Sequence, residues 1–209
     1  MNLHLPKKLQ NLLQAPAAAE NAQKERLLLK RKIKINSRTF FFSFLFLAAA
    51  ASAHAADFQL TSSAFKEGGA IPREYTCQGK AVSPALQWRG APAGTQSFSL
   101  IVTDPDAPKG TWTHWVLYSL PAPVSNLPSA IPAISVLANG ERNGKNSSGQ
   151  LGYYAPCPPT GNHHYYFTIY ALDFSPALDA GASKEDLEKA MEGHILAQAQ
   201  LLGRYQKSS

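Results

Sequence analysis

The chain lacks a hydrophobic run long enough to cross a membrane as a helix. Its most apolar stretch, residues 40–51, is about 12 residues long, whereas a transmembrane helix needs ~20. The chain also lacks the G-x-S-x-G nucleophile elbow of α/β-hydrolases and the H-E-x-x-H zinc motif of metalloproteases. These absences argue against a helical membrane protein and against two hydrolase classes that motifs define.

Charge is scarce as well, because only 16% of the 209 residues are Asp, Glu, Lys or Arg. Residues 1–55 contain nine basic and two acidic residues, a net charge of +7, which leaves 11 basic and 12 acidic residues, a net charge of −1, in 56–209. The basic excess of the whole chain therefore belongs to its N-terminal segment. Since the remainder has no basic stripe, the sequence does not predict a nucleic-acid partner.

The N-terminal segment has the three parts of a secretory signal peptide. A basic region at 24–38 precedes the apolar run at 40–51, and the small-residue sequence Ala53-His54-Ala55 follows. We expect cleavage after Ala55 and a periplasmic or secreted protein; an uncleaved anchor is the alternative. Residues 1–55 are therefore interpreted as an N-terminal extension with a signal peptide, and 56–209 as a single domain.

Cysteine is limited to Cys77 and Cys157. In an exported protein, an even number of cysteines favours a disulfide. One bridge would close the 77–157 loop, tie the loop around Cys157 to the rest of the domain and stabilise the fold by a few kcal/mol. Two separate free thiols are the alternative.

The pattern of apolar residues predicts a mostly β domain. Long strands are expected at 96–103, 114–120 and 165–172, where β-branched, aromatic and alternating apolar residues gather, and shorter ones at 57–61 and 85–88. Residues 121–161 are rich in Gly, Pro, Asn and Ser, which predicts mostly loop.

The C-terminal part predicts a helix followed by a less certain segment. The sequence Ser183-Lys184-Glu185-Asp186 is typical of a capping box that opens a helix to about Glu192. A further helical turn is expected at 194–197. Alternation over 199–205 favours a last strand, although a helix continuing to Gly203 fits nearly as well.

Two rigid loops carry the candidate site residues. Proline fixes φ, so the turn Asp104-Pro105-Asp106-Ala107-Pro108 holds its two acids in place just before His114. The second loop has the same organisation, prolines followed by histidines at the start of a strand, and reads Pro156-Cys157-Pro158-Pro159-Thr160-Gly161-Asn162-His163-His164-Tyr165. We interpret the two loops as the walls of one small polar pocket.

Each polar side chain has a structural and a functional interpretation. Asp104 either caps backbone N–H groups, as turn aspartates often do, or orients a histidine and accepts from a ligand; Asp106 favours the structural role. Because side chains alternate along a strand, Tyr165 shares the face of His163, whereas His164 points outside the pocket or pairs with an acid. Tyr153 and Tyr154 either line the rim of the pocket or pack within the fold. His194 is expected to be a surface or core residue.

This set of groups suits a small anion. Imidazoles, a tyrosine hydroxyl and loop N–H groups donate to phosphate, and Asp104 accepts from a cationic or hydroxylated group of the same ligand. An Asp–His pair could also act as a base in hydrolysis, and a metal at Asp104, His114 and His163 would have an acceptable ligand set. The sequence spacing supports neither, so we predict a non-catalytic protein with no metal and no cofactor.

These motifs resemble, in order and spacing, those of the phosphatidylethanolamine-binding protein family, and more narrowly its bacterial Raf-kinase-inhibitor-like branch. The resemblance covers nearly all of 56–209. It includes the D-P-D-A-P turn, His114-Trp115, the C-P-P-x-G-x-H-x-Y pattern at 157–165 and Tyr170-Ala171-Leu172-Asp173, together with Phe58-Gln59-Leu60-Thr61-Ser62, Cys77, Ser83-Pro84-Ala85-Leu86-Gln87-Trp88 and Gly193-His194-Ile195-Leu196-Ala197.

The resemblance implies a central antiparallel sheet, a second smaller sheet, C-terminal helices and a small anion pocket near one end. The residues that match the family's motifs are Asp104, His114, Pro158, Pro159, His163 and Tyr165 as ligand-binding residues, with Asp106 and Pro108 shaping the turn. His164 stands where the family often has arginine, which puts that arginine's role in doubt here.

The resemblance implies a binding protein for phosphate-bearing ligands such as phospholipid headgroups, and the signal peptide predicts that it is secreted. The alternative is a protein-interaction module that inhibits a protease or kinase-type partner, although a cytosolic kinase is a poor target for an exported protein. An Asp/His hydrolase is a third hypothesis. If imidazolium binds the anion, ligand affinity falls as pH rises above the histidine pKa, whereas a docking surface need not depend on pH.

Overall fold

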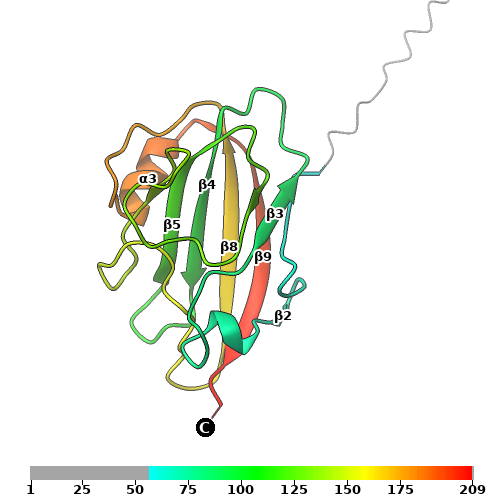
Figure 1. Cartoon of the computed structure of the whole chain (residues 1–209), viewed down its shortest axis with the longest axis vertical. Helices are drawn as coiled ribbons and strands as arrows, with labels where there is room; N and C mark the ends of the chain where they lie inside the picture. Colours follow the sequence, from blue (N-terminus) through cyan, green and yellow to red (C-terminus); the bar gives the residue numbers. More distant parts are fainter. Residues whose placement is uncertain (1–56, 209) are drawn as a thin grey trace, which may run out of the picture. The chain divides into compact units, whose positions relative to one another are not determined.

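The computed structural model describes residues 57–208 (Figure 1). The predicted signal peptide and its cleavage site lie outside these residues. Within this part of the chain, no helix is both long enough and apolar enough to cross a membrane.

A six-stranded sheet with the order β2-β9-β8-β4-β5-β7 forms the centre of the domain. Its four long strands are antiparallel to their neighbours, and only the short β2 pairs in parallel, with β9. The strands are β2 (Gly69–Ala70), β4 (Ser97–Asp104), β5 (Trp112–Pro121), β7 (Arg142–Asn143), β8 (Asn162–Leu172) and β9 (Ile195–Gln206). The three long strands predicted from the apolar patterning are thus confirmed as β4, β5 and β8.

A smaller sheet of order β1-β3-β6 covers one face of the central sheet (Figure 1). It consists of β1 (Gln59–Thr61), β3 (Leu86–Arg89) and β6 (Asn126–Leu127). Between the sheets, Trp88 of β3 packs edge-on against Phe98 of β4, with ring centroids 5.3 Å apart. The larger apolar core lies here because both sheets turn alternate apolar side chains toward each other.

The α-helix α3 (Lys184–Met191) covers part of the opposite face. Its buried Leu187 and Met191 belong to a second apolar cluster with Val116 and Tyr118 of β5. The predicted capping box is confirmed: Ser183 Oγ accepts from the backbone N–H of Asp186 at 3.1 Å, and Asp186 Oδ2 accepts from the backbone N–H of Ser183 at 3.0 Å.

Two expectations about the C-terminal part were wrong. Residues 194–197 form no helical turn, and the part of the chain that the structure describes has one α-helix rather than several, besides the short 3-10 helix η1 (Arg73–Tyr75). Gly193 has φ +77°, a left-handed conformation that ends the helix and reverses the chain. Ile195 then pairs with Leu172, so the strand alternative was correct and begins earlier than expected.

The predicted disulfide is present. Cys77 and Cys157 are bridged across a sequence separation of 80, with their Cα atoms 5.4 Å apart. The backbone N–H of Cys77 also donates to the carbonyl of Pro156 at 3.0 Å. The bridge therefore attaches the proline-rich loop to the segment that follows η1.

Candidate functional site

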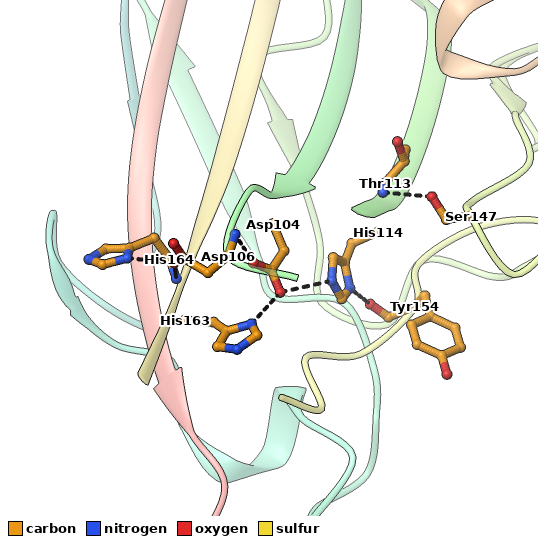
Figure 2. A network of polar contacts seen from close by, with 8 residues as sticks. All are labelled: Asp104, Asp106, Thr113, His114, Ser147, Tyr154, His163 and His164. Carbon is orange, nitrogen blue, oxygen red and sulfur yellow. Dashed lines mark hydrogen bonds and ion pairs between the residues drawn. The ribbon is translucent and has the colours of Figure 1, made fainter. Parts of the chain in front are cut away.

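The candidate site forms where three central strands meet at one end of the sheet. Asp104 is the last residue of β4, His114 lies near the start of β5 and His163 near the start of β8. Because β4 runs antiparallel to both neighbours, its end lies beside their beginnings. Figure 2 shows the three side chains pointing toward one another.

Asp104 is at the centre of this cluster and is only 3% exposed. Its Oδ1 accepts from the backbone N–H of Asp106 at 2.9 Å, and its Oδ2 accepts from His163 Nδ1 at 2.7 Å. The carboxylate thus does both things that the sequence left as alternatives. It caps the turn and it orients a histidine.

His114 is held by a backbone carbonyl on the facing loop. Its Nδ1 lies 2.6 Å from the carbonyl oxygen of Tyr154, and since a carbonyl only accepts, Nδ1 carries the proton. Burial lowers the pKa of His114, an effect that the Tyr154 hydrogen bond and the Asp104 charge oppose. The imidazole is therefore neutral near pH 7, with an unprotonated Nε2 located 4.0 Å from Asp104 Oδ2.

These residues line a pocket of about 200 Å³. The lining consists of Asp104, Ala107, Pro108, Trp112, His114, Tyr154, Cys157, Pro158, Pro159 and His163. The two loops singled out in the sequence therefore supply most of the wall, and half of the disulfide belongs to it.

Tyr165 lies beside the pocket lining rather than in it. Its fully buried ring packs edge-on against His114, with centroids 5.1 Å apart, and stacks on His163 at 6.5 Å. Burial, together with the nearby Asp104 charge, raises the pKa of the hydroxyl, so it keeps its proton.

Sequence analysis missed Trp112, which also lines the pocket and whose buried Nε1 has no hydrogen-bond partner in the described residues. The signal was available, because Trp112 precedes His114 by two residues and shares its face of the strand. Tyr154 takes the predicted rim position. Tyr153 packs instead, with its hydroxyl donating to the carbonyl of Tyr75 at 2.9 Å.

The D-P-D-A-P turn is fixed from outside by His164. Asp106 Oδ2 accepts from the backbone N–H of His164 at 2.8 Å and from its Nδ1 at 2.7 Å, and these hydrogen bonds lower the pKa of Asp106. His164 therefore pairs with an acid of the turn, as one of the two sequence expectations had it. His194 is exposed, pairs with Asp173 at 2.8 Å and does not line the pocket.

The fold and site together define a class, a two-sheet β protein with a buried Asp–His cluster at one end of the central sheet. The family model of the phosphatidylethanolamine-binding protein matches residues 61–206. The chain belongs to this family.

Curated relatives include UPF0098 proteins from an archaeon and a bacterium. The one from Methanothermobacter thermautotrophicus is 47% identical over 148 residues, which cover 71% of this chain and 98% of that protein. The one from Aquifex aeolicus is 45% identical over 158 residues, covering 74% and 92%.

Two solved structures share the fold. A phosphatidylethanolamine-binding protein homolog from Chlamydia trachomatis has a TM-score of 0.66 and 44% identity, covering 72% of this chain and 98% of that one. Escherichia coli YbcL, described as a member of the mammalian family, has a TM-score of 0.68 and 33% identity, covering 73% and 100%.

Proposed function

We propose that this protein is an exported, non-catalytic binding protein that holds small phosphate-bearing anions, such as phospholipid headgroups, in the pocket around Asp104, His114 and His163. The observation that carries the proposal is the convergence of two imidazoles on one buried carboxylate inside a small pocket. Family membership supports a binding protein of this kind.

Donor groups at the pocket suit the oxygens of a phosphate. His163 donates its Nδ1 proton to Asp104, so when the ring carries a second proton, Nε2 can donate to a ligand. The indole N–H of Trp112 is a donor at every pH. Because Asp104, His114 and His163 are buried, hydrogen bonds among them and to a ligand are stronger there than at the surface.

A non-catalytic role is supported by the composition of the lining. The pocket wall contains no serine, threonine or lysine, and its cysteine is bound in the disulfide. The wall therefore lacks the aliphatic hydroxyl, free thiol and amine that many covalent catalysts use. The family relatives are not named as enzymes.

Export is proposed from two independent features. The N-terminal segment has the basic, apolar and small-residue parts of a signal peptide. The Cys77–Cys157 bridge is of the kind that forms and persists in oxidising compartments such as the periplasm.

The test is calorimetric titration of the purified protein with inorganic phosphate, phosphoethanolamine and a short-chain phospholipid. We expect saturable heat with at least one of them, and its loss in His114→Ala. Preference among the three then defines the ligand class. No heat with any of them would contradict the anion-binding proposal.

One observation favours protein interaction as a second candidate function. No Lys, Arg, Asp or Glu occurs from Gly110 to Gly140, and this stretch exposes Ile134 by 53% and Val136 by 46%. Ile134 lines an apolar groove of about 580 Å³. If the protein is a protease inhibitor that docks here, Ile134→Asp abolishes inhibition in a protease panel but keeps phosphate binding. A wild-type protein that inhibits no protease in the panel contradicts that role.

A further inference from the structure

We propose that the pocket selects anions that bring their own hydrogen-bond donor, and that its ligands are phosphomonoesters bound with one P–OH group between Asp104 and His114. This inference rests on the proposed function. It narrows that function from phosphate-bearing ligands in general to those that end in a singly protonated phosphate.

One half of the pocket offers only acceptors. Burial lowers the pKa of His114 and favours the neutral ring, whose single proton is on Nδ1, where it is donated to the Tyr154 carbonyl; the unprotonated Nε2 lies 4.0 Å from Oδ2 of Asp104. That separation is too long for a direct hydrogen bond between them. A bare phosphate oxygen placed between these atoms would face a lone pair and a carboxylate, whereas a P–OH group can donate to either one.

The contacts of Asp104 keep both of its carboxylate oxygens as hydrogen-bond acceptors. Its Oδ1 accepts from the Asp106 N–H at 2.9 Å and its Oδ2 from His163 Nδ1 at 2.7 Å, and both contacts require the oxygens to accept. The acceptor half of the pocket is therefore built into the fold by β4 and β8.

The other half offers a donor that has no partner. Nε1 of Trp112 is buried and unpaired within the described residues, although buried donors are normally satisfied in proteins. Trp112 lines the pocket, so its indole N–H matches an unprotonated oxygen of the same phosphate. A ligand with both acceptor oxygens and one O–H satisfies both halves.

The ionisable groups that line the pocket are Asp104, His114, Tyr154 and His163, with Tyr165 beside it and Asp106 in the adjoining turn. A phosphomonoester loses its second proton near pH 6, which is also the range in which histidines titrate. A pH profile alone therefore cannot separate loss of the P–OH group from loss of the imidazolium. Ligands of equal charge are needed instead.

Methyl phosphate and dimethyl phosphate provide this comparison at about pH 5.5. Both are then mainly monoanions with one phosphorus centre, but only methyl phosphate has a P–OH group. We expect methyl phosphate to bind the wild-type protein about tenfold more tightly or better, since a hydrogen bond to a charged group is at stake. Equal affinities would overturn the inference and leave the proposed function standing.

Two further outcomes separate the alternatives. Glycerophosphoethanolamine is a phosphodiester without a P–OH group, but its ammonium group could supply the donor. If it binds tightly while methyl phosphate binds weakly, the donor is the ammonium group, and the P–OH assignment is overturned. If none of the three ligands binds, the proposed function fails, and the inference with it.

The variant Asp104→Asn tests the assigned atoms. The Asp106 N–H requires an acceptor at Oδ1, so the amide oxygen takes that place and the NH₂ group replaces Oδ2. A donor then stands where the wild-type protein has an acceptor, and the preference for methyl phosphate over dimethyl phosphate should shrink to near equality. A variant that melts normally and keeps the full preference would overturn the placement of the P–OH group.

Discussion

Nδ1 of His163 lies 2.7 Å from Oδ2 of Asp104, although the two residues are 59 positions apart in the sequence. The contact joins the end of β4 to the start of β8 and involves two side chains that are both almost completely buried. A buried carboxylate that loses a hydrogen-bond donor is costly to the fold. The same contact therefore serves both the stability of the domain and the shape of the pocket.

We expect His163→Ala to abolish phosphate binding and to lower the free energy of unfolding by about 1–3 kcal/mol, because Asp104 stays buried with one partner fewer. Urea denaturation and calorimetric titration measure the two effects. His194→Ala is the matched control, since His194 also pairs with an aspartate but is exposed and lies outside the pocket lining. Equal effects of both variants on binding would refute the role of His163.

Because of the Asp106–His164 pair, we expect the stability of the fold to depend on pH in the acid range. Its hydrogen bonds lower the pKa of Asp106 in the folded state, so the stabilisation is complete above the unfolded pKa of ~3.9 and is lost as pH falls through the lower folded value. His164→Ala should move the pKa of Asp106 up toward its ordinary value, which a carboxyl NMR titration measures. Both side chains are more than a third exposed, so the cost near pH 7 should stay below about 1 kcal/mol. An unmoved pKa would contradict the pairing.

The long strands could be predicted because local composition decides them. β4 and β8 are rich in β-branched and aromatic residues, in runs that suit a buried strand. The short strands β2, β6 and β7 have two residues each, too few to show any period, and they exist only because a neighbouring strand lies beside them. The expected helical turn at 194–197 failed for the same reason, because pairing between Ile195 and Leu172 decides that segment.

The candidate site was predictable in its residues but not in its protonation. The rigid loops and the alternation of side chains were enough to select Asp104, His114 and His163. Which nitrogen of His114 carries the proton depends on the carbonyl of Tyr154, a backbone atom 40 residues away. No sequence pattern specifies such a contact, and the acceptor half of the proposed anion pocket depends on it.

Asn143 should be important for the stability of the fold, because it joins the loop that contains Pro132 and Ile134 to Trp115 of β5. It is fully buried, accepts from Trp115 Nε1 at 2.9 Å and donates to the carbonyls of Pro132 and Ile134 at 3.1 and 2.7 Å. Asn143→Ala leaves the buried indole N–H of Trp115 and two loop carbonyls without this partner, so we expect a loss of about 1–3 kcal/mol in thermal or urea unfolding. The exposed Asn139→Ala is the control, and a similar small loss in both variants would contradict the prediction.

Reduction of the Cys77–Cys157 bridge should weaken ligand binding as well as the fold. Cys157 lines the pocket between Pro156 and Pro158, and both cysteines are exposed, so a dithiol can reach the bridge. Losing a bridge between residues 80 positions apart should cost about 2–4 kcal/mol of stability. Reduction should also lower phosphate affinity, because the proline-rich loop at 156–159 is then no longer covalently linked to the segment that follows η1. Titration of the protein with and without dithiothreitol measures this, and the double variant Cys77→Ser/Cys157→Ser, which dithiothreitol cannot alter, is the control. Unchanged affinity in the folded, reduced protein would show that packing alone holds the wall in place.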